Sequence, residues 1–443
     1  MSVTLLNAGL AFGIAAILAL ALFLLLLFRP RAGITLLLVV VVLDGSREWA
    51  LPLNLELAGI NVIATDVVAV ALAAVAALRV DKMSASLPVR AALLALTTLS
   101  MLGLMSWILA EGLESGFNTW RAWGLGLAAV WYALSWPELK SAHGLQPFVW
   151  AAFLASFFQA AGIALHGFGS SSDTVLVDGE FLNSRPLSAS VALLMLVGLV
   201  ILWFSPAKPS VYRWLGIGWL FLSVVLAQHR SVWVAALLFV GLATYSVIRR
   251  SERRLLTATA GAALVTIGLV AVAATMRTQQ QLSSSASNTD TFEWRIDNWT
   301  EKLTTARPPW EWLVGSTFGP TYLTDPASDG VRFKLEAHNM VVDMITWIGL
   351  VGLLLIIVVV VSTLRTRSSI TTDGMFTVPI MALLGYSFFY SWPAWTWIIV
   401  GIALQSRPPS SRSREGDANL LATAHHDSSA RSLGHAPHVV AQP

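Results

Sequence analysis

The sequence contains no cysteine, and only 12% of its 443 residues are charged. A chain without cysteine has no disulfide, no thiolate metal ligand and no cysteine nucleophile. About a quarter of the residues are charged in an ordinary soluble domain, so this chain is too poor in charge to cover a water-facing surface. A soluble globular protein is therefore excluded. The basic residues are scattered among loops, so no nucleic-acid partner is expected.

Apolar residues make up 56% of the chain and gather in long runs. A run of about 20 apolar residues can cross a bilayer as a helix, because a helix satisfies its own backbone polar groups. The run 255–274 is apolar on every face, unlike the alternating strands of a membrane barrel. The sequence thus predicts an all-α polytopic membrane protein with about 12 to 13 transmembrane helices. The predicted spans lie near residues 8–28, 33–43, 59–78, 88–110, 119–136, 147–166, 186–204, 212–228, 231–248, 255–275 and 338–363.

The apolar stretch 376–404 is too long for one minimal span and carries tyrosine, tryptophan and proline in its middle, so we expect a hairpin or a broken helix there. The first apolar segment lacks the basic start of a signal peptide and is expected to stay in the mature protein. The predicted organisation is roughly ten transmembrane helices in residues 1–275, a large outer loop in 276–337, C-terminal transmembrane helices in 338–404 and a disordered cytoplasmic tail in 405–443.

Basic residues set the orientation of these spans. If the N-terminus is outside, most lysines and arginines fall in inner loops, including the pairs at 249–250 and 253–254. This asymmetry is typical of the cytoplasmic side. The large polar segment 276–337 then lies outside, and the short outer loops hold few cations, namely Arg47, Arg121, Arg185 and Arg230.

The outer loop contains one predicted amphipathic helix. Asp290 and Glu293 have the spacing of a capping box. We expect this helix to lie on the membrane or over a cavity, because one stripe of it is apolar, formed by Phe292, Ile296, Trp299 and Leu303. Arg295 and Lys302 occupy a neighbouring face, two turns apart, which suits either joint binding of an anion or plain exposure to solvent. The later turn at 315–319 is rich in glycine and could bring backbone N–H groups close to a phosphate, although most such turns only reverse the chain.

The loop ends in His338 and Asn339, directly before an apolar run with Gly349 and Gly352, whose small size favours close approach of a neighbouring helix. An imidazole at the mouth of a helix can act as a general base or as a phosphate ligand. Asp343, four residues after Asn339, is predicted to face the same mouth as a supporting group.

Two of the outer arginines stand directly at predicted helix ends, in the sequences Asn-Ser-Arg185-Pro and Gln-His-Arg230-Ser. A guanidinium group matches phosphate geometry with two parallel hydrogen bonds and keeps its charge. Arg185 and Arg230 therefore suit either a bound phosphate group or simple snorkelling to lipid headgroups, whereas Arg47 and Arg121 are less distinctive. Asp66 and Asp343 fall inside apolar runs, where an acidic group usually has a partner.

Together these features resemble the O-antigen ligase and polymerase family of bacterial membrane glycosyltransferases. The resemblance covers about residues 180–364 and depends on the long outer loop, its glycine-rich turn and the residues Arg230, Arg295, Trp299, His338, Asn339, Gly349 and Gly352. Gln228 and His229, before Arg230, depart from the small residue expected there.

The resemblance implies an enzyme of the bacterial cytoplasmic (inner) membrane that acts on its outer, periplasmic side. It implies transfer of a glycan from a polyprenyl (undecaprenyl) diphosphate carrier to a hydroxyl of an acceptor lipid or glycan, among membrane lipids, without a metal or another cofactor. In this interpretation Arg185, Arg230 and Arg295 bind the diphosphate. His338 is the catalytic base, and in-line attack inverts the anomeric configuration; Trp299, Asn339 and Asp343 are supporting residues.

Three alternatives stay open at this stage. A polymerase of the same family would extend a lipid-linked chain instead of transferring it to a final acceptor. A lipid or polysaccharide transporter is less consistent with the sequence, because intramembrane charges are few and no internal repeat is evident. A scaffold without chemistry gives no reason for the outer arginines and histidine.

Overall fold

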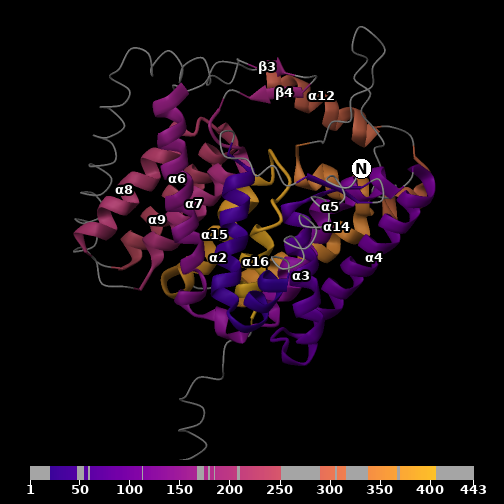
Figure 1. Ribbon diagram of the computed structural model, residues 1–443, viewed down its shortest axis with the longest axis horizontal. Helices are drawn as coiled ribbons and strands as arrows, with labels where there is room; N and C mark the ends of the chain where they lie inside the picture. The colour runs from indigo at the N-terminus through magenta and orange to yellow at the C-terminus, as the bar shows by residue number, and fades with distance from the viewer. Residues whose placement is uncertain are drawn as a thin grey trace, which may run out of the picture. The chain divides into compact units, whose positions relative to one another are not determined.

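The computed structural model describes residues 20–46, 54–57, 60–111, 113–166, 174–177, 180–183, 185–206, 210–250, 290–304, 307–315, 338–366 and 370–405. Within these ranges the chain is an α-helical membrane protein, as the sequence predicts (Figure 1). Among the described residues, three helices are long and apolar enough to cross a membrane, and they lie within α4 (Leu87–Glu111), α6 (Gln146–His166) and α14 (Met340–Thr366). The predicted span 255–275 and the tail after residue 405 lie outside the described residues.

The other predicted spans between residues 33 and 248 also fold as helices, with ends that shift by a few residues. These helices are α2 (Pro30–Asp44), α3 (Ala64–Leu78), α5 (Leu113–Leu134), α7 (Ala189–Phe204), α8 (Val211–Leu226) and α9 (Arg230–Arg250). Helix α7 forms the centre of the core, since every residue from Val191 to Ile201 is buried. It packs against α6, α8, α9 and α15 (Ile370–Tyr386).

Two short β-hairpins, which are not expected from the apolar runs, precede helices in the chain. Strands β1 (Asn54–Leu57) and β2 (Ile60–Ile63) pair antiparallel before α3, and β3 (Thr174–Val177) and β4 (Glu180–Asn183) pair antiparallel ahead of α7. The predicted span 59–78 therefore begins as a strand, and its helix starts only at Ala64. Each hairpin has two residues between its strands, Ala-Gly and Asp-Gly, and Asp-Gly flanked by apolar residues is a strong hairpin signal.

Helix α14 bends at Gly349, where a short helix of the loop packs against it. Gly349 has φ of +66°, and Gly315, at the end of α13 (Pro309–Val314), has φ of +80°. A Cβ atom on Gly349 would lie 2.3 Å from the backbone oxygen of Leu313, and one on Gly315 would lie 2.1 Å from that of Trp347. Only glycine fits this backbone contact. The expected close approach is confirmed for Gly349, but the nearest atoms to a Cβ on Gly352 belong to Ile348 of the same helix.

The stretch 376–404 is a broken helix, as predicted. Helix α15 ends at Tyr386, a non-helical segment covers residues 387–395, and α16 (Thr396–Leu404) follows. All nine residues of α16 are buried. After it, the amide of Gln405 donates hydrogen bonds to the backbone oxygens of Ala133 and Trp136, which tie the end of α16 to the end of α5. The total number of crossings stays a prediction.

Candidate functional site

The functional residues predicted from the sequence gather at one end of the helices, where α3, α7, α9 and α14 begin and α2 ends. The end of α2 is joined to the start of α7 by a hydrogen bond from the Ser188 N–H to the Gly45 carbonyl oxygen (2.9 Å). Ser46 and Leu187 form a β-bridge beside it. Residues from the ends of several helices, far apart in the sequence, therefore lie close together at this end of the protein.

Tyr390, in the break between α15 and α16, lies at the centre of this place. Its hydroxyl accepts a hydrogen bond from the guanidinium of Arg295 (3.2 Å), whose Cζ lies 5.0 Å from the centre of the phenol ring. The ring of His338 lies 5.2 Å from the Tyr390 ring, and Tyr386 stacks on Tyr390 at 5.4 Å. Tyr390 thus connects the predicted catalytic histidine to a predicted diphosphate ligand.

Arg185 and Arg230 belong to the same group of cations. Burial lowers the pKa of Arg185, and the nearby positive charge of Arg230 lowers it further, whereas Tyr390 raises it. The Nε atoms of Arg185 and Arg295 are buried and have no hydrogen-bond partner among the described residues. Two guanidinium groups with unused buried donors therefore adjoin one tyrosine, which is an arrangement suited to an anion.

His229 holds Arg185 in place. Its Nδ1 lies 3.0 Å from a guanidinium nitrogen of Arg185, and its Nε2 lies 2.9 Å from the backbone oxygen of Leu187. An arginine can only donate and a carbonyl can only accept, so the neutral ring carries its proton on Nε2. Burial, followed by the charge of Arg185, lowers the pKa of His229 to about 3, so the ring stays neutral at physiological pH.

His338 precedes α14 in a left-handed backbone conformation, with φ of 51°. Gln228, two residues before Arg230, has φ of 56°, and no other non-glycine residue in the described ranges has a positive φ. Such conformations cost free energy and are found preferentially at functional sites. Burial, then the charges of Arg295 and Lys302, lower the pKa of His338 to about 4. The imidazole is therefore neutral at pH 7.

Asn339 and Asp343 support this geometry without joining the cation group. The side-chain oxygen of Asn339 accepts hydrogen bonds from the backbone N–H groups of Val341 (2.9 Å) and Val342 (3.2 Å), so Asn339 caps α14. Its amide donates to the backbone oxygen of Phe388 (3.2 Å). The buried carboxylate of Asp343 accepts a hydrogen bond from the Ser391 hydroxyl (2.6 Å). Both residues fasten the start of α14 to the segment that carries Tyr390.

The predicted amphipathic helix is α12 (Asp290–Thr304). The face that bears Arg295, Asn298 and Lys302 points toward the protein, where Asn298 and Lys302 are buried. Ile296 and Leu303, in the predicted apolar stripe, are exposed, and Trp299 is half-buried. Lys302 is therefore not a solvent-facing residue.

The glycine-rich turn supplies no phosphate ligand within the described residues. The Gly315 N–H donates to the backbone oxygen of Glu311 (2.8 Å), and residues 316–319 lie outside those residues.

A cavity of about 510 Å³ lies beside His338 and Tyr390. Both residues line it, together with Arg121, Ser188 and several tryptophans, whereas Arg185, Arg230 and Arg295 do not.

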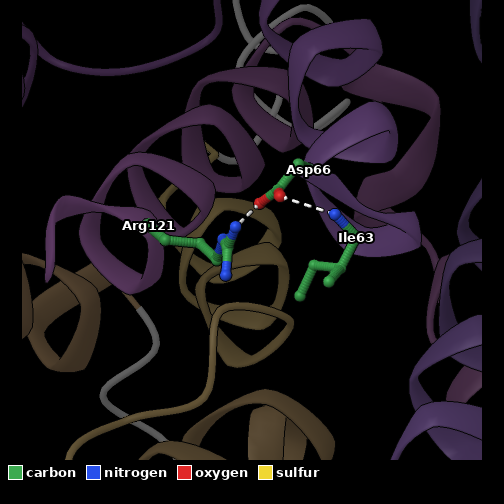
Figure 2. A network of polar contacts seen from close by, with 3 residues as sticks. All are labelled: Ile63, Asp66 and Arg121. Atoms are coloured by element: carbon green, nitrogen blue, oxygen red, sulfur yellow. Dashed lines mark hydrogen bonds and ion pairs between the residues drawn. The ribbon is translucent and has the colours of Figure 1, made fainter. Parts of the chain in front are cut away.

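Arg121 reaches from α5 to Asp66 in the first turn of α3, where Nε and a carboxylate oxygen are 2.8 Å apart (Figure 2). The other oxygen of Asp66 accepts the Ile63 N–H (3.0 Å). The predicted partner of Asp66, an acidic residue inside an apolar run, is therefore Arg121.

The geometry defines a class of protein: a helical membrane protein with a group of arginines beside a neutral histidine at one end of its helices. Residues 215–357 match the family model described as O-antigen ligase, and this match supports the predicted resemblance to the O-antigen ligase and polymerase family. The matched segment contains Arg230, Arg295 and His338. A comparison with curated proteins found no match.

The contact between His229 and Arg185 gives one expected result. His229→Ala removes a hydrogen bond to a charged group, which is worth about 1.5–3 kcal/mol, so we expect transfer activity to fall roughly tenfold to a hundredfold. His229→Gln, whose side-chain oxygen can accept from Arg185, should retain more activity than His229→Ala. The exposed His143 gives a matched control, His143→Ala, with unchanged activity. Equal activity of His229→Ala and the parent protein would refute this positioning role.

Proposed function

We propose that the protein is a membrane glycosyltransferase that moves a glycan from a polyprenyl diphosphate carrier to an acceptor hydroxyl. The family match supports glycan transfer of the O-antigen ligase or polymerase type. The observation that carries the finer proposal is the group of Arg185, Arg230 and Arg295 around Tyr390, next to the neutral His338.

In the proposed reaction the acceptor oxygen attacks the anomeric carbon as the bond between that carbon and the diphosphate breaks. Negative charge grows on the leaving diphosphate, and the three guanidinium groups stabilise it. The hydroxyl proton passes to the neutral imidazole of His338. Attack opposite the leaving group inverts the anomeric configuration. In this proposal the arginines replace a metal as the source of positive charge.

We place the reaction on the outer, periplasmic side of the bacterial cytoplasmic membrane. The charge asymmetry of the loops supports this side. Helix α12, which brings Arg295 to the site, belongs to the loop that this orientation puts outside. The proposed division of the chain follows: transmembrane helices before residue 276 and in 338–404, the loop at 276–337, and a cytoplasmic tail after 405.

The decisive test is an in vitro assay with the purified full-length protein, an undecaprenyl diphosphate-linked glycan and a panel of acceptor lipids and glycans. We expect transfer that persists in EDTA, with a product of inverted anomeric configuration by NMR. Loss of activity in EDTA, or retention of configuration, would contradict the corresponding part of the proposal.

In intact cells, Thr300→Cys in this cysteine-free chain should react with an impermeant thiol reagent, and Ser141→Cys should not.

A further inference from the structure

The cavity beside His338 has a wall of tryptophans from four parts of the chain. Trp123 of α5 meets Trp347 of α14 edge to face, with ring centres 6.2 Å apart, and lies 6.4 Å from Trp397 of α16. Trp392, before α16, lies 5.4 Å from Trp397. All four line the cavity. Such flat faces pack well against the C–H faces of a pyranose ring, and a cavity of about 510 Å³ is large enough for a sugar unit.

The cavity lining also contains polar side chains, which a purely apolar occupant would not match. The guanidinium of Arg121 lines it, as do the hydroxyls of Ser188, Ser190 and Ser391. Burying such groups against hydrocarbon costs free energy. By contrast, the pocket formed by the helix at residues 20–28, α3 and the start of α5 is lined almost wholly by apolar side chains such as Phe23 and Val67. A lipid tail suits that pocket, whereas the tryptophan-lined cavity suits a molecule with hydroxyls.

The charge of this cavity differs from that of the arginine group. Arg121 is paired with Asp66, and Asp44 is close enough to interact electrostatically with both. The positive charge of Arg121 is thus balanced by neighbouring carboxylates, so the pair offers donors and acceptors without a net attraction for anions. Sugar hydroxyls both donate and accept, and they match such a pair.

From these observations we propose that the tryptophan-lined cavity is a binding site for an uncharged sugar unit of the acceptor, anchored by Arg121, with Asp66 as the positioning residue. This inference rests on the proposed function, because it identifies the acceptor side of the same site. His338 and Tyr390 line the cavity and also adjoin the cations, so a hydroxyl bound there lies beside the proposed base. The two substrates thereby meet at His338 from chemically opposite sides, one anionic and one neutral.

The absence of cysteine permits a direct binding test on the full-length protein in detergent. Ser188, exposed at the cavity, is replaced by cysteine, and its alkylation by the uncharged reagent iodoacetamide is followed by mass spectrometry. The probes are neutral methyl hexosides and methyl deoxyhexosides, with glucose 6-phosphate, glucuronic acid and farnesol for comparison. We expect at least one neutral glycoside to slow alkylation severalfold, and the other probes to have little effect. Thr300→Cys on α12 is the control and should not respond.

Variants of the charged pair sharpen the test. In the Ser188→Cys background, Arg121→Gln should raise the half-protecting sugar concentration about tenfold or more, since it loses hydrogen bonds from a charged donor. Arg121→Lys keeps a positive charge beside Asp66 but loses the planar guanidinium group with its paired donors, so it should also weaken protection by the sugar. Asp66→Asn removes a carboxylate that balances the positive charge of Arg121, so glucose 6-phosphate should now protect the cysteine at position 188 from alkylation. The exposed Arg365 gives the matched control Arg365→Gln, which should leave protection unchanged.

The outcomes separate this inference from the proposed function, because protection is measured without donor. The inference is wrong if no neutral sugar protects, if farnesol or the charged sugars protect better, or if Arg121→Gln has no effect. Transfer by the parent protein without any sugar protection would overturn the cavity assignment alone. Sugar protection that survives in Arg295→Ala, a donor-side variant, supports two distinct subsites. Sugar protection with no transfer from any polyprenyl diphosphate donor would overturn the donor proposal and leave the sugar site standing.

Discussion

His338→Ala is expected to lower turnover by about a hundredfold to ten-thousandfold while donor binding changes little. The reason is that a positioned general base contributes about this factor to a proton transfer. His338→Arg should fail as well, because a guanidinium is always protonated and cannot accept the hydroxyl proton. Turnover and donor binding are measured separately on purified variants, with His143→Ala as the control. Restored transfer in His338→Arg would show that the histidine serves as a cation instead.

The same assignment gives a pH profile. The pKa of His338 is lowered to about 4 by burial and by the cations Arg295 and Lys302. The base form is required, so kcat/KM should be level around neutrality and should fall as pH drops through about 4. A bound diphosphate adds negative charge beside the ring and favours the protonated form, so the acidic limb of kcat should lie at higher pH. A kcat/KM limb near the ordinary histidine pKa would contradict this description of His338.

Arg295→Ala is expected to lower kcat about a hundredfold to a thousandfold, which is the usual cost of removing one donor that stabilises charge in the transition state. Arg295→Lys should already be defective, because an ammonium group cannot replace a planar fork that donates to Tyr390 and to a diphosphate at once. The effect should appear mainly in kcat, since charge on the leaving group grows during the reaction. Arg230→Lys and Arg185→Lys should likewise lower kcat.

The matched control for this series is the exposed Arg365 on α14. Arg365→Lys should have the activity of the parent protein. Tyr390→Phe removes the acceptor for Arg295 but keeps the ring beside His338, so its loss of kcat should be smaller than that of Arg295→Ala. Full activity of Arg295→Ala and Arg230→Ala together would remove the diphosphate site from the proposal.

Much of the helical framework could be predicted from the sequence, because apolar length alone specifies a helix in lipid. The helix in the loop and the break in 376–404 could also be predicted, because amphipathic spacing and a central aromatic cluster are local sequence signals. His338, Arg185 and Arg295 can be singled out from the sequence, because charged or titratable side chains beside apolar runs usually have a partner or a function. The structure brings these residues, from segments far apart in sequence, around Tyr390, but their roles stay predictions until tested.

The residues that connect the site were harder to find. Tyr390 looked like one more interfacial aromatic, and His229 like a departure from a family pattern; only the folded chain places them against Arg295 and Arg185. The direction in which α12 faces also depended on tertiary contacts, because the sequence offered both an apolar and a cationic face. The two hairpins could have been found from their two-residue turns, but they fell beside apolar runs that favoured helix.

The contact between Gly315 and Gly349 has a consequence for engineering and for evolution. The two glycines touch through their backbones, so the loop is seated on α14 at a point where neither partner can gain a side chain alone. A chimera that receives a foreign loop in place of residues 276–337 must keep a glycine at both positions, even if Arg295 and His338 are retained. Loop exchange in this chain is therefore constrained by this contact, and a foreign loop with another residue at the position of Gly315 must be transplanted together with the part of α14 that it touches.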